Sequence, residues 1–422
     1  MTAPPGITQS AKRADWTVQS ERCATAAARA SLLRLCAAAF VAYSSYAICR
    51  SPLLPLFARE LGAGPSLVGF VMGASTVTGI FVKLPAGTLS DLFGRRRLLL
   101  AGALVFAALP FTYLAVSTLT LLIVLRFLHG SATAIFGPVA SASLSDVAPP
   151  AARGAWLSMY STAQGAGQAI GPVIAGYLIA VGRFDLAFAI SGLIGLGVPL
   201  LVTTGQFDGS RGPDDPIGAS GRFSWSAFTR GVGEVGRDRL ILATSGAQAA
   251  QFVLHGMLSA FLPLYGRDVL GLSPLQLGWL FGVQTVTTMA MRPGIGLLSD
   301  RVGRRWVIVC GLTVCSLAVL SLSIAHTVSA VVVAVIIYAA GVAMTTAATS
   351  AFITDVTRRA RYGAAHGVFG TIYDVGDALG PLAGGLLVAS VGYGHMFQIM
   401  AGLALAMAAA FFVATRARTS ST

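Results

Sequence analysis

Two aspartates, Asp374 and Asp377, lie in the middle of a long apolar segment, residues 363–390, and none of the other acids lies so deep in an apolar run. They are three residues apart, so they share one face of a helix. At ~1.5 Å per residue, both would lie near the centre of a helix that spans a membrane. Burial and a like-charged neighbour favour the neutral form of such a carboxyl group unless a cation is close. We predict that the pair carries protons; a cation-binding substrate site and a permanent ion pair with Lys83 or Arg50 are the alternatives.

Two further ionisable residues are candidates for proton coupling. Arg126 lies in "RFLHGSATA" (Arg126–Ala134). Because an arginine does not release its proton near neutral pH, its role would be to bias a nearby acid or bind an anion, or to anchor helices by hydrogen bonds. His255 titrates near neutrality and is a secondary proton candidate.

Other polar residues at middle depth are expected to line a substrate cavity, although each alone could instead be an interhelical hydrogen-bonding residue. Arg50 is the most informative, because the second half of the chain has no arginine at the corresponding position. The predicted cavity residues are Arg50, Tyr43, Tyr46, Gln164, Gln168, Gln251 and Gln284.

The elements that must position these residues are membrane helices. Of 422 residues, 55% are hydrophobic and 11% are charged, with a mean hydropathy of +0.76. A soluble domain is about a quarter charged, and a bilayer crossing needs roughly 20 apolar residues. We count twelve such runs: about 32–57, 66–88, 98–117, 119–143, 154–180, 186–204, 240–265, 274–297, 306–326, 328–350, 363–390 and 394–415. Embedded charges occur only in runs 1, 2, 4, 8 and 11, so these should line the interior, while runs 3, 6, 9 and 12 should face lipid.

The basic residues indicate the orientation of these helices. Most of the 29 Lys and Arg residues fall in the termini, the central loop and the loops after runs 2, 4, 8 and 10. This distribution places both termini in the cytoplasm and argues against a nucleic-acid surface, which would be contiguous. Lys83 and Arg292 lie within spans about two turns from the same face, and we expect their side chains to extend to the cytoplasmic surface.

An internal repeat divides the chain into two halves. "GTLSDLFGRRR" (Gly87–Arg97) returns 209 residues later as "GLLSDRVGRR" (Gly296–Arg305), and "GPVIAG" at 171–176 returns as "GPLAGG" at 380–385 with the same offset. Two parallel six-helix units with a site between them are typical of transporters. The predicted organisation is a cytoplasmic tail at 1–30, six-helix bundles at 31–205 and 240–416, a cytoplasmic central loop at 206–239, and a second tail at 417–422.

Each copy of the repeated phrase combines residues suited to a helix–helix turn. Gly87 and Gly296 would let neighbouring backbones approach closely, and Gly94 and Gly303 would permit a tight turn. The acids at the membrane edge are available for salt bridges, and the arginines resist translocation across the membrane. The phrase could instead serve topology and folding alone.

Twelve spans, duplicated halves and two copies of G-x-L-S-D-x-x-G-R-R resemble the major facilitator superfamily, in particular its 12-helix drug:proton antiporter branch. The resemblance implies a cytoplasmic gate in which Asp91 meets the N-terminal end of the eleventh helix and Arg95 reaches Asp146. A second, weaker copy would join Asp300, Arg304 and Asp355. The gate residues are therefore Gly87, Asp91, Gly94, Arg95, Asp146, Gly296, Asp300, Gly303, Arg304 and Asp355.

Two more segments carry this resemblance. Arg126 and Gly130 are similar to the family's R-x-x-x-G motif, whose arginine is implicated in proton transfer or substrate contact. "GAGQAIGPVIAG" (Gly165–Gly176) resembles the glycine-proline motif of proton-coupled exporters, although "GPLAGG" shows that duplicated packing is the alternative explanation. The predicted helix-packing residues are Gly167, Gly171, Pro172, Gly176, Gly380, Pro381 and Gly384.

The sequence thus predicts an all-α membrane protein in the bacterial cytoplasmic (inner) membrane. We expect a monomeric secondary transporter that exports a small amphipathic or drug-like molecule in exchange for protons by alternating access; a proton-coupled importer or facilitator of a sugar, organic acid or lysolipid is the alternative. We expect no enzyme, cofactor, metal or nucleic-acid partner, because the sequence offers no nucleophile–base pair and no metal-type cysteine spacing. It also lacks an ATP-binding G-x-x-x-x-G-K-[ST] loop, so the energy would come from a gradient.

Overall fold

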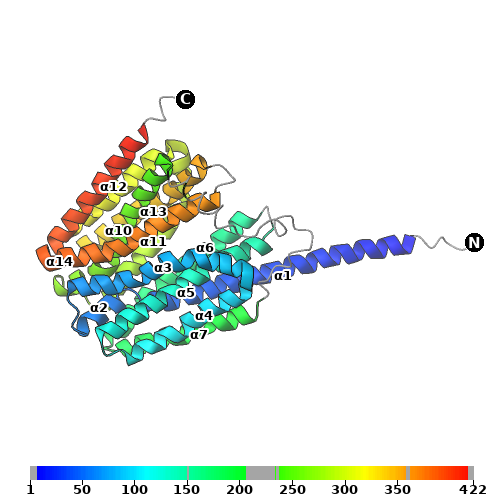
Figure 1. The fold of residues 1–422 in the computed structure, drawn as a ribbon, viewed down its shortest axis with the longest axis horizontal. Helices are drawn as coiled ribbons and strands as arrows, with labels where there is room; N and C mark the ends of the chain where they lie inside the picture. The colour runs from blue at the N-terminus through cyan, green and yellow to red at the C-terminus, as the bar shows by residue number, and fades with distance from the viewer. Residues whose placement is uncertain (1–6, 150–151, 206–232, 234–236, 358–361, 417–422) are drawn as a thin grey trace, which may run out of the picture.

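The computed structural model describes residues 7–149, 152–205, 233, 237–357 and 362–416, and every regular element in these ranges is helical (Figure 1). The predicted central loop falls almost wholly outside them. Side chains of residues 7–27 and of a few helical residues, Asp91 among them, are also outside the description. The first half contains α1 (Ile7–Ile48), α2 (Leu53–Glu60), α3 (Pro65–Phe93), α4 (Arg95–Thr112), η1 (Tyr113–Ala115), α5 (Leu119–Val147), α6 (Arg153–Ala180) and α7 (Phe184–Thr203). The second contains α10 (Arg239–Asp268), α11 (Pro274–Val302), α12 (Arg304–Leu322), α13 (Val328–Val356) and α14 (Tyr362–Ala414).

The helices follow the predicted apolar runs, with three differences. First, α1 begins at Ile7, so most of the predicted tail is helical and projects from the bundle (Figure 1). Second, the first run is interrupted after Ile48 and resumes as α2; Pro52 lies in the break, where its missing N–H and ring oppose a continuous helix. Third, the last two runs form one element, α14, which is kinked at Gly392 with φ 79°.

Eight segments of the described chain are long and apolar enough to cross a membrane, and Ala365–Ala414, with both parts of α14, counts as one of them. The segments of α6, α10 and α11 are not among the eight. α10, for example, contains Gln248, Gln251 and His255. Polar residues reduce the mean hydropathy of a helix that faces a cavity, so composition alone detects such a helix less well than one that faces lipid.

Local sequence signals set the helix starts. Thr118 caps α5 and Thr327 caps α13, each accepting a hydrogen bond from a backbone N–H three residues on. Ser273 and Gln276 form a capping box at the start of α11. A side-chain oxygen at these positions satisfies a backbone donor that has no partner within the helix. Thr118 and Thr327 are 209 residues apart, so the repeat extends to the caps.

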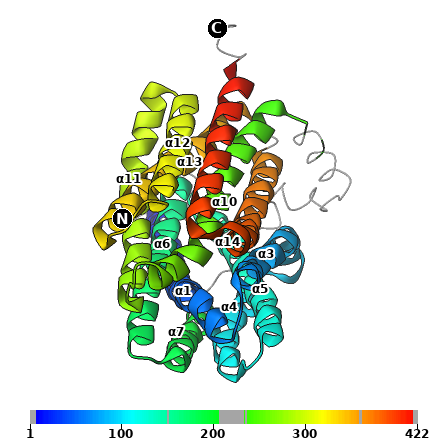
Figure 2. The same cartoon turned by 90° about the vertical axis from the view of Figure 1, so that its left-hand side faces the viewer.

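The two halves repeat their tertiary contacts as well as their sequence. The Arg96 guanidinium donates to the Thr203 carbonyl oxygen at 2.7 Å, and Arg305 donates to the Phe412 carbonyl oxygen at 2.7 Å. Each residue of the second pair lies 209 positions after its counterpart. The helices of each half lie together in two orthogonal views (Figures 1 and 2). The molecule is therefore pseudo-symmetric in its contacts.

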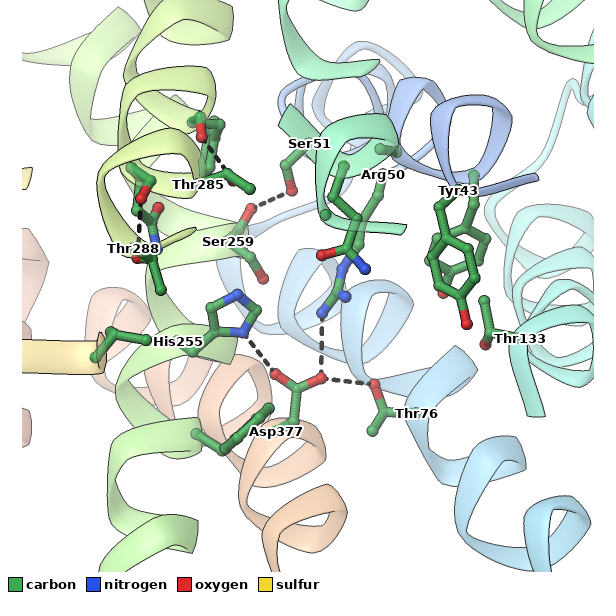
Figure 3. A pocket seen from close by; sticks show the side chains of 18 of the residues that line it. Tyr43, Arg50, Ser51, Thr76, Thr133, His255, Ser259, Thr285, Thr288 and Asp377 are labelled. Atoms are coloured by element: carbon green, nitrogen blue, oxygen red, sulfur yellow. Dashed lines mark hydrogen bonds and ion pairs between the residues drawn. The ribbon is translucent and has the colours of Figure 1, made fainter. Parts of the chain in front are cut away.

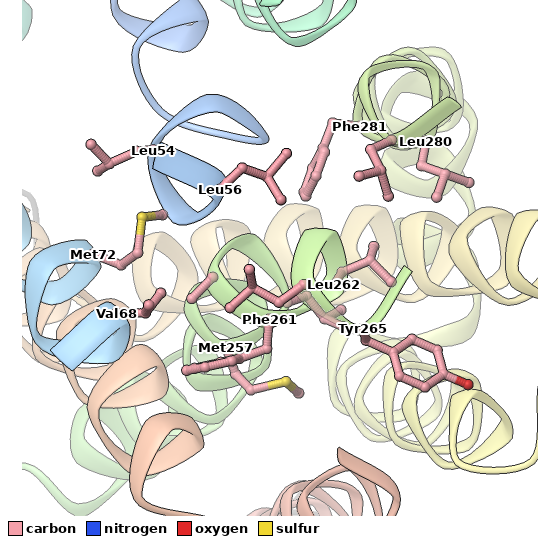
Figure 4. Packing of buried hydrophobic residues seen from close by; sticks show 14 of the residues in the cluster. Leu54, Leu56, Val68, Met72, Met257, Phe261, Leu262, Tyr265, Leu280 and Phe281 are labelled. Carbon is pink, nitrogen blue, oxygen red and sulfur yellow. The ribbon is translucent and has the colours of Figure 1, made fainter. Parts of the chain in front are cut away.

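Among the described residues, a buried apolar cluster joins the two halves at one end of the molecule and not at the other. We call the end with the Gly94 and Gly303 turns and their arginines the arginine-rich end. At the opposite end, one apolar cluster combines residues of both halves, including Leu56 of α2 and Met72 of α3 with Phe261 of α10 and Leu280 of α11 (Figure 4). At the arginine-rich end, each apolar cluster draws its residues from a single half.

Glycines distinguish the two ends in the same way. At the opposite end, a Cβ on Gly69 would lie 2.2 Å from the Pro381 carbonyl oxygen, and a Cβ on Gly278 would lie 2.4 Å from that of Pro172. These contacts join α3 to α14 and α6 to α11, which belong to different halves. Toward the arginine-rich end, Gly296 has no heavy atom within 4 Å of a Cβ position. The molecule is closed at the opposite end and open at the arginine-rich end.

Candidate functional site

A cavity of about 430 Å³ lies between the two halves (Figure 3). This volume is within the range of small-molecule sites, ~300–1,000 Å³. Its lining residues come from α1 and the turn that follows it, from α3, α5 and α6 of the first half, and from α10, α11, α13 and the first part of α14. In the described ranges, α4, α7, α12 and the part of α14 after Gly392 contribute none. This arrangement agrees with the expectation that the charge-bearing helices line the interior.

Asp377 joins both halves at the wall of this cavity. One carboxylate oxygen accepts from the Arg50 guanidinium at 3.1 Å and from the Thr76 hydroxyl at 3.2 Å. The other lies 3.0 Å from Nδ1 of His255 (Figure 3). Asp377 is 7% exposed. A nearly buried carboxylate with three polar partners is well held as an anion.

Asp374 makes a second link between the halves, because its carboxylate lies 2.5 Å from Nζ of Lys83 on α3. The prediction that Lys83 extends to the arginine-rich surface is wrong: its ammonium group turns into the cavity, where an acid from the other half compensates its charge. The Tyr373 ring lies 5.9 Å from the same ammonium nitrogen and stacks on Phe252. In this conformation both acids are thus in ion pairs with the bases that the sequence suggested, Asp374 with Lys83 and Asp377 with Arg50.

The cavity wall holds two acid–base pairs that join the halves. Both acids belong to α14 in the second half, and their cationic partners belong to the first half: Arg50 lies in the turn between α1 and α2, and Lys83 lies on α3. A proton added to either carboxylate would remove an ion pair that joins the two halves. A hydrogen bond from Ser51 to the Ser259 carbonyl oxygen, 2.7 Å, is a further link between the halves.

Arg126 is fully buried and does not line the cavity. It donates to the Ser75 hydroxyl at 2.5 Å, and Ser75 does line the cavity. Its Nε and Nη1 atoms have no hydrogen-bond partner among the described residues, and none of the described acids pairs with it. His129 lies beside it and is hydrogen bonded to the Tyr113 hydroxyl at 3.2 Å. The structure therefore does not bring Arg126 into contact with either carboxylate.

Most of the predicted cavity residues lie in its wall: Tyr43, Tyr46, Arg50, Gln168, Gln251 and Gln284, together with His255. Gln164 is not a lining residue; it lies against Tyr43, one turn closer to the arginine-rich end than Gln168. Sequence reasoning missed several lining residues, among them Thr76, Lys83, Thr285, Thr288, Arg292 and Tyr373. Helical spacing from Gln284 would have found those on α11, since 281, 284, 285, 288 and 292 share one face.

At the arginine-rich end, Arg95 pairs with Asp146 at 3.1 Å. In the second half, Arg304 pairs with Asp355 at 2.6 Å and with Asp300 at 2.7 Å. Each of these described pairs joins residues of one half. Gly94 has φ 90° and Gly303 has φ 97°, so both turns use the conformation that favours glycine. The role of these residues as a gate stays a prediction.

The two remaining glycines of the repeated motif are Gly296, whose surroundings differ from expectation, and Gly87, whose surroundings are not described. Gly296 was expected to allow a close backbone approach, but no described heavy atom lies within 4 Å of its Cβ position. This expectation is wrong for the present conformation, because the halves are apart at this end. Gly87 and Asp91 lie on α3, but their surroundings are not described.

The predicted packing residues lie at helix crossings. A Cβ on Gly167 would be 2.5 Å from the Phe40 carbonyl oxygen, and one on Gly171 would be 2.5 Å from Cβ of Ala47, both on α1. Gly176 packs against α11, and Gly380 and Gly384 pack against α10. Pro172 and Pro381 supply the carbonyl oxygens that face Gly278 and Gly69. The glycine-proline segments thus serve both packing within each half and contact between the halves.

Comparison with known proteins agrees with this architecture. The family model for the Major Facilitator Superfamily matches residues 35–278 and 244–422. The multidrug resistance protein MdtG of Proteus mirabilis is 27% identical over 83% of this chain and 88% of its own length. MdtG of Citrobacter koseri is 25% identical over 84% of this chain and 87% of its own length.

A similar fold occurs in a crystal structure of a bacterial homolog of the human lysosomal transporter Spinster, in an inward-facing and unoccupied conformation. The TM-score is 0.75 at 17% identity, and the alignment covers 94% of this chain and 98% of that one. The matched family and these relatives are membrane transporters and not enzymes.

Proposed function

We propose that this chain, which belongs to the Major Facilitator Superfamily, is a secondary active transporter that exports a small amphipathic molecule in exchange for protons. The observation that carries the proposal is the pair of acids, Asp374 and Asp377, that hold bases of the other half in a cavity between the halves. The relatives named as multidrug resistance proteins support export as the direction.

The proposed arrangement in the membrane has twelve spans in two six-helix bundles, 31–205 and 240–416. α1 with α2 forms the first span, and the two parts of α14 form the last two. The bundles are joined by a cytoplasmic loop at 206–239 and flanked by cytoplasmic segments at 1–30 and 417–422, in the inner membrane of a bacterium. The arginine-rich end faces the cytoplasm, since loops rich in arginine stay on that side. The present conformation is then inward-open, and the protein works as a monomer.

Alternating access follows from the contacts between the halves. The glycine crossings and the shared apolar cluster close the outer end. Opening that end separates α3 from α14 and α6 from α11, while the arginine-rich end closes. The symmetry of the two crossings lets the halves rock about the cavity without unfolding either bundle.

The proton acts on the links between the halves. Within the part of the chain that the structure describes, Asp377 has three polar partners, whereas Asp374 has one, Lys83. Protonating Asp374 therefore breaks fewer interactions. We assign Asp374 as the carboxylate that exchanges protons with the cavity and Asp377 as the one that holds Arg50 and His255 in place. Loss of the Lys83 ion pair frees α14 to move relative to α3.

The test uses purified protein in liposomes with a pH-sensitive dye inside and a transported substrate identified by thermal stabilisation. An imposed pH gradient should drive uphill substrate movement by the wild-type chain. Asp374→Asn should retain downhill substrate movement and lose the associated proton flux. Asp377→Asn should reduce both, because it leaves Arg50 and His255 without their acid.

Asp185→Asn is a matched control, because this exposed acid pairs only with the neighbouring Arg183 in the described structure. It should leave coupling unchanged. Proton flux that persists in Asp374→Asn, and also when Asp374→Asn is combined with Asp377→Asn, would refute the assignment. Transport driven only down the substrate gradient by the wild type would refute proton coupling altogether.

A further inference from the structure

Arg292 of α11 is a cation without an acidic partner. It follows Phe281, Gln284, Thr285, Thr288 and Met289 along one face of α11, and all six residues line the cavity. Among the residues described, no acid lies within ion-pair distance of its guanidinium, and the guanidinium donates no hydrogen bond. Arg292 is exposed, and it lines the cavity, so its guanidinium is accessible from there.

The pseudo-symmetry shows what is missing. Arg292 lies 209 residues after Lys83, and Asp374 lies 209 residues after Gly165. The crossings that carry these positions are equivalent: Gly69 of α3 faces Pro381 of α14 as Gly278 of α11 faces Pro172 of α6. The α3–α14 crossing therefore holds a base and an acid. The α6–α11 crossing holds a base and a glycine.

None of the described acids supplies the missing charge at this crossing. Gly165 lines the cavity, and a Cβ there would lie 2.7 Å from the Met289 sulfur atom. The neighbouring position that corresponds to Asp377 is Gln168, which is neutral. Arg50 and Lys83 are matched by two acids, so Arg292 leaves the cavity wall with one excess positive charge.

We propose that Arg292 binds the anionic group of the transported molecule, which is an amphipathic organic anion bearing a carboxylate or another singly charged oxyanion. This inference rests on the transporter function proposed above and names its substrate class. A positive charge in a partly desolvated wall attracts an anion more strongly than in water, and arginine offers several donors to a planar oxyanion. Phe281, Met289 and Val342 provide apolar wall for the rest of the molecule.

The experiment measures thermal stabilisation of the detergent-purified chain by three probes of one size: 1-naphthaleneacetate, 1-naphthaleneacetamide and 2-(1-naphthyl)ethylamine. The wild type should bind the carboxylate best. Arg292→Gln should weaken carboxylate binding by roughly 10- to 100-fold, the effect of losing a charged hydrogen bond, and leave the amide unchanged. Arg292→Lys should retain most of the preference. Arg301→Gln, at the exposed end of the same helix and outside the cavity wall, is the control and should match the wild type.

A second variant restores the missing acid. The variant combines Gly165→Asp with Met289→Ala, because the Met289 side chain occupies the space that the new aspartate needs. It should lose the preference for the carboxylate and gain affinity for the amine. The variant with Met289→Ala alone removes apolar wall that would contact the naphthyl ring shared by the three probes, so it should weaken all three to a similar extent and keep the carboxylate preferred. The proposal is overturned if Arg292→Gln binds the carboxylate as the wild type does, or if the wild type prefers the amine.

A measurement that needs no bound probe completes the test. In a chain whose native cysteines are replaced, Thr288→Cys lies one turn from Arg292 on the cavity wall. Its labelling by anionic and cationic methanethiosulfonates reports the local charge. The ratio of anionic to cationic rates should fall several-fold with Arg292→Gln, and an unchanged ratio would also overturn the inference. If these results hold but no proton-coupled transport occurs in liposomes, the anion site stands and the proposed transport function fails.

Discussion

Substitution of the interface glycines by alanine provides a sharp test of the conformational argument. Gly69→Ala places a methyl carbon 2.2 Å from the Pro381 carbonyl oxygen, and Gly278→Ala places one 2.4 Å from that of Pro172. Ordinary contacts of this kind are longer than about 3.4 Å, so each crossing must widen by roughly 1 Å. Both obstacles are backbone atoms, which cannot move aside as a flexible side chain can.

The cost of such overpacking is typically about 1–3 kcal/mol. It applies only while the outer end is closed, because the two helices of each crossing belong to different halves. Each substitution should therefore reduce the population of the present conformation relative to the outward-open one by roughly 5- to 140-fold, at about 1.4 kcal/mol per factor of ten. The two crossings share no residues, so their effects should add in free energy.

The assay is electron–electron double resonance between nitroxides on Thr162 of α6 and Arg301 of α11, which are exposed near the arginine-rich end. In both alanine variants the distance distribution should shift to shorter values as this end closes. Gly402→Ala is the matched control, because a Cβ there meets no described atom within 4 Å and the residue is exposed. An unchanged distribution in Gly69→Ala and Gly278→Ala, or an equal shift in Gly402→Ala, would refute the reasoning.

Three further outcomes follow from the same geometry. Asp268→Asn removes an ion pair with Arg59, 3.5 Å long, that joins the halves at the outer end. Because the pair is partly exposed, its loss should cost at most ~1 kcal/mol and should shift the distance distribution between the two nitroxides only slightly. A complete shift would contradict this estimate. Lys83→Met leaves Asp374 without its cation and should lower the free energy of unfolding by roughly 1–3 kcal/mol, less than the loss for a fully buried pair. In thermal denaturation, adding Asp374→Asn should recover most of the lost stability. If no stability is recovered, the two residues do not act as a pair. Gly296→Ala meets no obstacle in the present conformation but would obstruct closure of the arginine-rich end, so it should favour this conformation, opposite in sign to Gly69→Ala; a shift toward closure would show that this glycine plays no part there.

The sequence predicts the helices well because each apolar run is a local property. Eleven long helical elements follow the predicted runs, and the 209-residue offset correctly pairs Arg96 with Arg305 and Gly69 with Gly278. The interruption after Ile48 was missed. Composition does not register it, since the leucines after Pro52 continue the apolar run.

Contacts between the halves were harder to predict, because they depend on how the helices are arranged and on the conformation. The position of Lys83 along α3 indicated a route to the surface, but the residue that decides its orientation is Asp374, almost 300 positions away. Gly296 was expected at a close crossing, yet its end of the molecule is open. The list of acids and bases was available from the sequence. The pairs that they form, and the lack of a described acid beside the cavity-lining Arg292, required the structure.

The repeat separates what the two halves share from what distinguishes them. The shared features hold helices together: the paired glycine crossings, the Thr118 and Thr327 caps, and the arginine–carbonyl contacts. Equivalent crossings give the halves matching surfaces on which to rock.

The ionisable groups of the cavity do not follow the repeat. Arg50 corresponds to Ser259, Asp377 to Gln168, His255 to Tyr46 and Asp374 to Gly165. Of the cavity's ionisable groups, the bases at Lys83 and Arg292 alone are common to both halves, and among the described acids one pairs with Lys83 and none with Arg292. If the acids served the fold alone, a duplicated fold would need them in both halves, and the α6–α11 crossing forms without one. This asymmetry supports our two proposals, which give the crossings separate tasks: proton exchange where the base is paired, and anion binding where it is not.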